Sequence, residues 1–124
     1  MVKRILVIDD DEAIRKVFLL ALEGTGYLVD TASSGSGGVE SLKQQPYDLI
    51  YLDLKMPGMD GVETLRRLKC IDDQAIVYII TAYFGEYKEE LENARKDGFE
   101  FELMKKPLTS AQLLSITNEI LGEE

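Results

Sequence analysis

The sequence predicts an α/β fold in which strands and helices alternate around a parallel sheet. Short, almost entirely apolar runs recur along the chain, among them Ile5–Ile8 and Ala75–Ile80. Such runs are typical of strands that are buried on both faces of a parallel sheet. Segments long enough for a helix separate these runs. We therefore expect right-handed crossovers, with helices covering the sheet.

Five strands are expected, each built around one of the apolar runs. Their approximate ranges are 3–9, 27–31, 48–53, 75–81 and 101–104. Strict alternation of these strands with helices predicts a single sheet with all its strands parallel.

Five helices are expected between and after the strands, near residues 12–24, 36–45, 61–71, 85–97 and 109–121. Asp11 is placed to cap the first helix, and the Gly24–Gly26 segment ends it. Pro46 ends the second helix. Thr109 and Gln112 have the spacing of a capping box, which begins the last helix.

The composition excludes several classes of protein. A chain of 124 residues with 45% hydrophobic and 30% charged residues is expected to form one domain over 1–124, with no output domain. The apolar runs are far shorter than the roughly 20 residues of a membrane helix, so we expect a cytoplasmic protein with no membrane partner. A net charge of −9 argues against direct binding of nucleic acid. The chain has no histidine, so any histidine chemistry must come from a partner.

Polar residues stand directly after four of the apolar runs. They are Asp9-Asp10, Asp53, Thr81 and Lys106-Pro107. Because the carboxyl ends of parallel strands converge on one crevice, we expect three carboxylates, a hydroxyl and an ammonium to meet there. Clustered carboxylates repel one another unless a cation intervenes, and hard carboxylate oxygens suit Mg²⁺ or Mn²⁺. The sequence therefore predicts a metal and phosphoryl site.

Each polar residue has a chemical role and an ordinary structural alternative. Asp53 could be a nucleophile that forms an acyl phosphate, or it could stabilise a turn. Asp9 and Asp10 could bind the metal or cap a helix. Thr81 could donate to a phosphoryl oxygen, although threonine is common in strands. Lys106 could neutralise phosphoryl charge or be solvated, and its bond to Pro107 is a candidate cis peptide.

Four blocks of the chain match one family in the same order. They are Ile5–Asp11, Asp48–Gly61, Ile80–Ala82 and Lys106–Pro107. From Lys3 to about Leu121 the chain resembles the receiver domain of two-component response regulators, and is similar to the single-domain chemotaxis and sporulation-phosphorelay members. The resemblance implies a flavodoxin-like (βα)5 doubly wound sheet with strand order 2-1-3-4-5.

The resemblance also implies the chemistry of the site. Asp53 would accept a phosphoryl group from a histidine on a kinase or phosphotransfer protein. Asp10, Asp53 and the backbone carbonyl of Lys55 would bind Mg²⁺, and Asp9 would reach the ion through water. The protein would then catalyse only its own phosphorylation and dephosphorylation, which makes it a signalling protein rather than an enzyme.

The resemblance further assigns the response to phosphorylation. Thr81 and Lys106 would contact the phosphoryl oxygens, and the face formed by the fourth helix, fifth strand and fifth helix would change its binding of an unknown downstream protein. Leu103 stands where the family has an aromatic or histidine switch residue, with Phe101 as the alternative. Lys105 is a rival to Lys106 for the catalytic lysine.

The first helix is apolar over a wide arc, which predicts a docking surface. Val17 and Leu20 belong to one apolar face, and Ile14, Phe18 and Leu22 form a second ridge. We expect Ile14 and Phe18 to lie exposed beside the crevice and to pack against the histidine-bearing partner. The plain alternative is a core helix with extra leucines. The protein as a whole is expected to be a monomer or a weak homodimer, and a phosphorylation-independent pseudo-receiver remains the alternative function.

Overall fold

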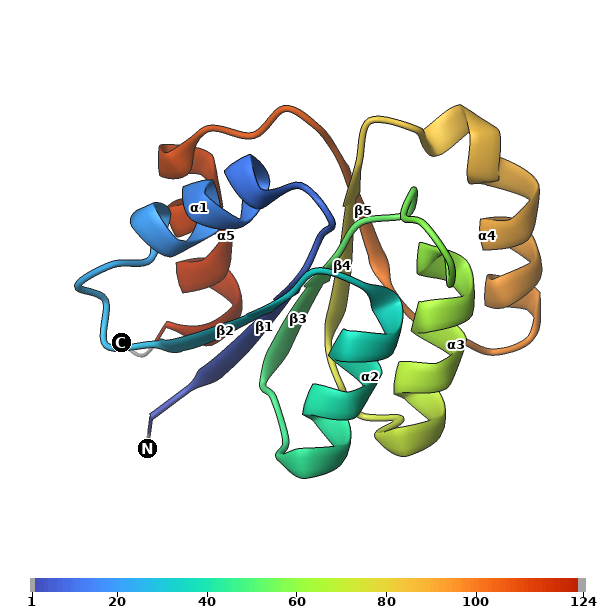
Figure 1. Ribbon diagram of the computed structural model, residues 1–124, viewed down its shortest axis with the longest axis horizontal. Helices are drawn as coiled ribbons and strands as arrows, with labels where there is room; N and C mark the ends of the chain where they lie inside the picture. Colours follow the sequence, from blue (N-terminus) through green and yellow to red (C-terminus); the bar gives the residue numbers. More distant parts are fainter. Residues whose placement is uncertain (1, 123–124) are drawn as a thin grey trace.

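The computed structural model describes residues 2–122 as a five-stranded parallel sheet with helices on both faces (Figure 1). The strands are β1 (Arg4–Ile8), β2 (Leu28–Ala32), β3 (Leu49–Leu52), β4 (Val77–Thr81) and β5 (Glu102–Lys105). They lie in the order β2-β1-β3-β4-β5, and every neighbouring pair is parallel. The predicted fold class and strand order are therefore confirmed. The outermost positions of the expected domain, residues 1, 123 and 124, lie outside the described residues.

The helices form two layers. They are α1 (Glu12–Ala21), α2 (Gly35–Gln44), α3 (Gly61–Ile71), α4 (Lys88–Lys96) and α5 (Ser110–Leu121), and a short 3₁₀ turn, η1 (Phe84–Tyr87), precedes α4. Figure 1 shows α1 and α5 on one face of the sheet and α2, α3 and α4 on the other. Thr109 and Gln112 form the expected capping box at the start of α5.

Two helix boundaries differ from the expected ones. The first helix ends at Ala21 rather than near residue 24, because the chain turns through Gly24 and Gly26, both of which have positive φ angles. The fourth helix was expected from residue 85 but begins as a 3₁₀ turn. Tyr83 offers no side-chain cap there, and Gly85 is a poor helix former, so a regular helix begins only at Lys88.

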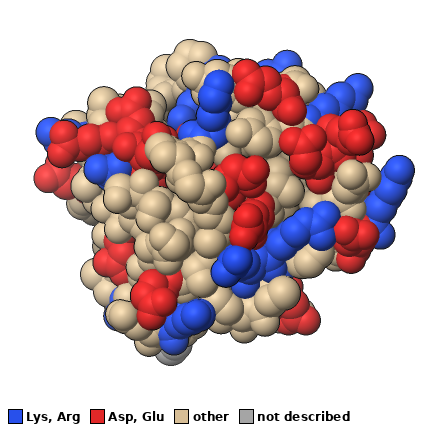
Figure 2. All heavy atoms as spheres, turned by 45° about the vertical axis from the view of Figure 1, so that its right-hand side comes forward, with Lys and Arg blue, Asp and Glu red and all other residues tan. Residues whose placement is uncertain are grey.

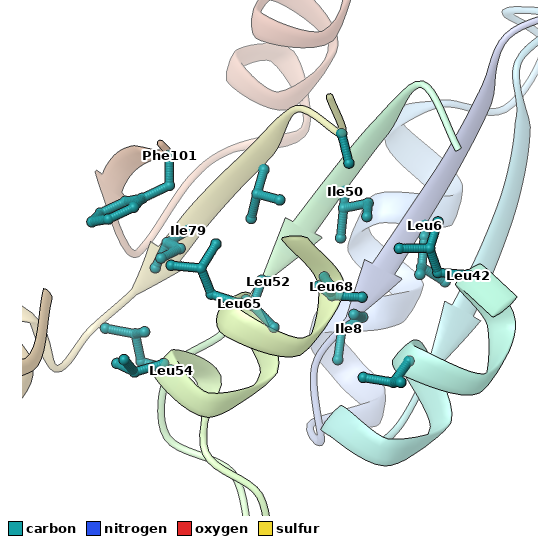
Figure 3. Packing of buried hydrophobic residues seen from close by; sticks show 14 of the residues in the cluster. Leu6, Ile8, Leu42, Ile50, Leu52, Leu54, Leu65, Leu68, Ile79 and Phe101 are labelled. Carbon is teal, nitrogen blue, oxygen red and sulfur yellow. The ribbon is translucent and has the colours of Figure 1, made fainter. Parts of the chain in front are cut away.

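Alternate residues of the central strands fill two separate cores. Leu6 and Ile8 of β1 join the cluster under α2, α3 and α4, part of which is drawn in Figure 3. Ile5 and Val7 of the same strand face α1 and α5. Because side chains alternate along a strand, a run that is apolar at every position is what a doubly covered sheet requires. The apolar runs of the sequence are thus explained.

The orientation of α1 corrects one prediction. Phe18 is only 4% exposed, and its ring lies 4.9 Å from that of Tyr51 of β3, centroid to centroid. Leu20 is 67% exposed instead, and Ile14 is half-buried. The helical period identifies two neighbouring apolar ridges but not the one that meets the sheet; the Tyr51 ring decides that. The expectation that Phe18 is exposed is therefore wrong.

The described surface mixes both signs of charge. On the face drawn in Figure 2, lysine and arginine side chains lie interspersed with aspartate and glutamate. Within residues 2–122, none of the helices combines the length and the apolar character needed to cross a bilayer. The face drawn has no continuous basic surface of the kind that a phosphate backbone requires. The exclusion of nucleic acid as a direct partner remains a prediction.

Candidate functional site

A cavity of about 760 Å³ opens at the carboxyl ends of the strands. Its lining includes Asp9, Asp10, Asp53, Lys55 and Lys106. These residues follow β1, β3 and β5 directly or within a few positions, as expected for polar residues at the carboxyl edge of a doubly wound sheet.

The strand register brings the two buried carboxylates together. Ile8 of β1 is paired with Leu52 of β3, so Asp9 and Asp53 are the next residues on adjacent strands. The backbone N–H of Asp53 donates to the Ile8 carbonyl at 3.0 Å, which extends the ladder up to the site. Between the ends of β4 and β5, the N–H of Lys106 donates to the Thr81 carbonyl at 2.9 Å. The backbone of the site is therefore held by the sheet.

The carboxylates form a cluster that fits a divalent cation. One oxygen each of Asp9, Asp10 and Asp53 lies within 4.8 Å of the others. Asp9 and Asp53 are 3% and 5% exposed, whereas Asp10 is open to solvent. The Oδ1 atom of Asp53 is buried and has no hydrogen-bond partner among the described residues. A buried acceptor without a partner is costly, and a hard cation with a partly hydrated shell would satisfy it.

Asp9 is bonded at both carboxylate oxygens. Its Oδ1 accepts the backbone N–H of Asp11 at 2.9 Å, and its Oδ2 accepts the Lys106 ammonium at 2.9 Å. The same ammonium lies 3.5 Å from Asp53 Oδ1, which makes an ion pair but not a hydrogen bond. Lys106 therefore joins the two carboxylates but is bound mainly to Asp9.

Burial and charge set the protonation of the site. Burial, and then the charge of Asp9, raise the pKa of Asp53 to about 6, although Lys106 acts in the opposite direction. Burial would lower the pKa of Lys106, but its hydrogen bond to Asp9 and the charges of both aspartates raise it overall. At neutral pH the site thus holds an ionised Asp53 beside a protonated lysine.

The two candidate lysines point in different directions. Lys106 enters the cavity, whereas Lys105 is exposed and its Nζ lies 5.9 Å from the centre of the Phe84 ring. Successive side chains on an extended segment alternate, so only one of the pair can reach the carboxylates. The bond between Lys106 and Pro107 is cis, as expected.

Thr81 lies outside the cavity lining. Its side chain is fully buried, and its hydroxyl oxygen accepts the N–H of Tyr83 at 2.9 Å. The two candidate switch residues do not line the cavity either. Phe101 is buried beneath the Arg95 guanidinium, which lies 4.0 Å from its ring centre, and Leu103 is half-buried against the same core.

Two contacts near the site were not expected from the sequence. The Lys55 ammonium lies 4.3 Å from the centre of the Tyr83 ring and 3.6 Å from Glu86 Oε2, so it bridges the β3–α3 loop to η1. The Arg15 guanidinium donates to the Asp9 carbonyl at 2.7 Å. The first contact joins segments distant in sequence, and the second joins α1 to the residue that follows β1. No local sequence pattern predicts either of them.

An apolar groove of about 330 Å³ adjoins the acidic cavity. Ile14, Ala82 and Lys106 line both hollows. The groove runs between α1 and the segment after β5, where Pro107 and Leu108 form its far wall. Exposed apolar surface thus lies directly beside the carboxylates.

Comparisons with known proteins agree with this geometry. The family model described as "Response regulator receiver domain" matches residues 5–118. The response regulator receiver protein CpdR of Brucella abortus is 33% identical over 118 residues, covering 95% of this chain and 93% of that protein. Sporulation initiation phosphotransferase F of Bacillus subtilis is 39% identical over 83 residues, or 67% of each chain. The solved structure of response regulator protein TrrA of Thermotoga maritima, in complex with Mg²⁺–BeF, is 31% identical with a TM-score of 0.78, covering 96% of this chain and 99% of that chain.

Some relatives are much longer. The chain spans 34% and 33% of the length of two transcriptional regulatory proteins that it also matches, from Bacillus subtilis and Streptomyces coelicolor. What the longer proteins do as a whole therefore does not transfer to this chain.

Proposed function

Because the chain belongs to the response regulator receiver domain family of two-component signalling, we propose that Asp53 accepts a phosphoryl group from a partner histidine. The observation that carries the proposal is the buried Asp53 oxygen without a hydrogen-bond partner, clustered with two further aspartates. The match to sporulation initiation phosphotransferase F, whose name states a phosphotransfer role, supports it.

The proposed reaction is a nucleophilic displacement at phosphorus. A carboxylate oxygen of Asp53 forms a bond to phosphorus while the phosphorus–nitrogen bond of the phosphohistidine breaks, and the electron pair stays on the histidine nitrogen. The histidine must come from another protein, because this chain has none. With a pKa of about 6, Asp53 is mostly ionised at neutral pH and its lone pair is available. Hydrolysis of the acyl phosphate returns the carboxylate and releases phosphate.

The charged residues of the site suit this chemistry. Asp10, Asp53 and the backbone carbonyl of Lys55 would hold Mg²⁺ or Mn²⁺, with Asp9 reaching the ion through water. Such an ion supplies positive charge against the phosphoryl oxygens. Lys106, within 3.5 Å of Asp53, adds a second positive charge on the protein side. Thr81 does not line the cavity, so its side chain would have to move toward it before donating to a phosphoryl oxygen. Its hydroxyl proton is available for this, because the bond to the Tyr83 N–H uses only a lone pair.

The histidine-bearing partner would dock on Ile14 and the apolar groove beside it. Ile14 lies at the edge shared by groove and cavity, so a helix seated there would bring its histidine to Asp53. Phe18 contributes to the groove but is buried against Tyr51, so its role is to support the surface. We expect Ile14→Glu to abolish transfer from a phosphotransfer protein that phosphorylates the wild type, while phosphorylation by acetyl phosphate is retained.

Leu20→Glu is the matched control for the docking surface, because Leu20 is on the same helix and exposed but lines neither hollow. It should transfer at the wild-type rate. Equal transfer by the wild type and Ile14→Glu would refute docking at Ile14.

The output would be a change in partner binding at the face of α4, β5 and α5. Phosphorylation adds about 1.5 to 2 negative charges at one strand end. Lys106 follows β5 directly, and the Arg95–Phe101 contact connects the start of β5 to α4, so a movement of Lys106 is transmitted to this face. The same proposal includes a cytoplasmic location and a monomeric or weakly dimeric state.

The first test is intact-mass spectrometry after incubation with acetyl phosphate, with and without Mg²⁺. The wild type should gain one phosphoryl group only when Mg²⁺ is present, and Asp53→Asn should gain none. Asp73→Asn, at an exposed aspartate at the other end of the sheet, should behave as the wild type. No adduct on the wild type under any condition would instead favour a pseudo-receiver that binds its partners without phosphorylation.

A further inference from the structure

A side-chain hydrogen bond closes the loop between β1 and α1. Arg15, in the second turn of α1, reaches back six residues, and its Nη1 donates to the Asp9 carbonyl at 2.7 Å. The contact spans Asp10 and Asp11, two of the three residues between β1 and α1. Arg15 is half-buried and does not line the acidic cavity, so its guanidinium acts on the backbone of the loop rather than on a bound group.

Asp10 depends on this loop for its orientation. No hydrogen bond or ion pair found in residues 2–122 holds the Asp10 carboxylate, which is exposed. The residues on either side are held firmly. The Asp9 N–H donates to the Ala32 carbonyl at 3.1 Å, and Asp11 caps α1 through the Ala13 N–H at 2.9 Å. The direction of the Asp10 side chain is therefore set by the backbone.

The Asp9 carbonyl belongs to the peptide unit that joins Asp9 to Asp10. Because a peptide unit is planar, fixing its oxygen also fixes the Asp10 nitrogen and Cα, and with them the start of the Asp10 side chain. Three consecutive aspartates repel one another, and a free loop would turn Asp10 away from Asp9 and Asp53. The Arg15 hydrogen bond opposes that rotation.

We propose that Arg15 is a positioning residue that preorganises Asp10 for divalent-cation binding by fixing the Asp9–Asp10 peptide plane. The proposal rests on the proposed function, in which Asp10 is a metal ligand. Outer contacts that orient metal ligands commonly alter metal affinity by about tenfold or more when they are removed. Arg15 would then change how tightly the ion is bound, with little effect on the phosphoryl transfer that follows.

The test compares Arg15→Met with Lys16→Met. Lys16 is the neighbouring exposed cation on α1, and its replacement by methionine removes the same single positive charge. Within the described part of the chain, no hydrogen bond joins Lys16 to the β1–α1 loop, so this variant loses the charge but no contact with the loop. Isothermal titration calorimetry with MgCl₂ alone should give a Kd raised about tenfold for Arg15→Met and less than about twofold for Lys16→Met. At saturating Mg²⁺, both variants should be phosphorylated by acetyl phosphate at rates close to that of the wild type.

A third variant separates geometry from charge. Arg15→Gln loses the charge but keeps an N–H donor, and we expect it to recover part of the affinity lost in Arg15→Met. Thermal melting by circular dichroism shows whether each variant is folded. An unchanged Mg²⁺ Kd in folded Arg15→Met, or equal losses in Arg15→Met and Lys16→Met, would overturn the proposal.

These outcomes are distinct from failure of the proposed function. A wild type that binds no Mg²⁺, or that binds Mg²⁺ but forms no Asp53 adduct, would contradict the phosphoacceptor function. A wild type that does both, with Arg15→Met matching it in Mg²⁺ affinity, would contradict only the role of Arg15.

Discussion

The carboxyl ends of β1 and β3 lie side by side and each carries a buried aspartate, but the two carboxylates are bonded in opposite ways. At the end of β1, the N–H, the carbonyl and both carboxylate oxygens of Asp9 have protein partners. At the end of β3, the backbone N–H of Asp53 is bonded, but the Oδ1 of its carboxylate has no hydrogen-bond partner among residues 2–122.

The difference separates a carboxylate that is fully bonded by protein groups from one that is not. Asp9 is held at every polar atom and organises Lys106, Asp11 and Arg15 around it. Within the described residues, Asp53 Oδ1 is buried with an ion pair to Lys106 but no hydrogen bond, and burial is the main cause that raises the pKa of Asp53 to about 6. Two identical residues on paired strands therefore differ because of the side chains that reach each of them.

Removal of Lys106, the cation that joins the carboxylates at the ends of β1 and β3, should have the largest effect on the free energy of unfolding. Lys106→Met leaves the Asp9 and Asp53 carboxylates buried without a positive charge between them, and breaking a buried pair in this way commonly costs roughly 3 to 5 kcal/mol. The pKa of Asp53 should rise further, so the destabilisation should be greater at pH 7.5 than at pH 5. Urea unfolding at the two pH values, without divalent cations, measures both effects.

Lys105→Met is the matched control for that experiment. It removes an equal charge from the adjacent residue, whose side chain is exposed. The free energy of unfolding should change by less than about 0.5 kcal/mol. Equal destabilisation by the two variants would mean that Lys106 does not hold the two carboxylates together.

Neutralising Asp53, at the end of β3, should stabilise the protein. The pKa of Asp53 rises on folding from an ordinary 3.8 to about 6, so the folded state binds the proton more tightly and stability falls as the pH rises through this window. At pH 7.5 the ionised Asp53 then costs up to roughly 3 kcal/mol. Asp53→Asn should raise the free energy of unfolding at pH 7.5 and have little effect near pH 4.

The quantity to measure is the difference between Asp53→Asn and the wild type across pH 4 to 7.5 in metal-free buffer. Asp73→Asn, at an exposed aspartate, should give a flat difference. If the difference in unfolding free energy between Asp53→Asn and the wild type does not grow with pH, ionised Asp53 does not destabilise the folded protein.

The smallest effect on the free energy of unfolding is expected for Asp11, which follows β1 and caps α1. Asp11→Ala removes the N-cap of α1, whose side chain accepts the Ala13 N–H, and should cost about 1 kcal/mol. Asp11→Asn keeps a capping oxygen and should lie within a few tenths of a kcal/mol of the wild type. Urea unfolding of both variants distinguishes capping from charge. A loss as large in Asp11→Asn as in Asp11→Ala would assign the effect to the charge.

The sequence alone was sufficient for the architecture and for the grouping of the site residues. The apolar runs became the three central strands, β1, β3 and β4, because a sheet covered on both faces needs apolar residues at nearly every position there. Asp9, Asp10, Asp53 and Lys106 meet because parallel strands end at one edge, and that edge follows from the order of the elements. Their assigned chemical roles remain proposals.

Side-chain direction and pairing were decided by the tertiary structure. The period of α1 could not tell whether Phe18 or Leu20 faces the sheet, since this depends on Tyr51 of β3. Thr81 was expected at the cavity, but its hydroxyl is buried and bonded to Tyr83.

The sequence by itself therefore determined which residues lie at the carboxyl edge of the sheet, because hydrophobic periodicity and strand order are encoded locally along the chain. Only the tertiary structure decided that Asp9 is fully hydrogen-bonded, while Asp53 Oδ1 has no hydrogen-bond partner among residues 2–122. That difference comes from side chains six to nearly a hundred positions away, Arg15 and Lys106, whose reach depends on how the helices and strands pack.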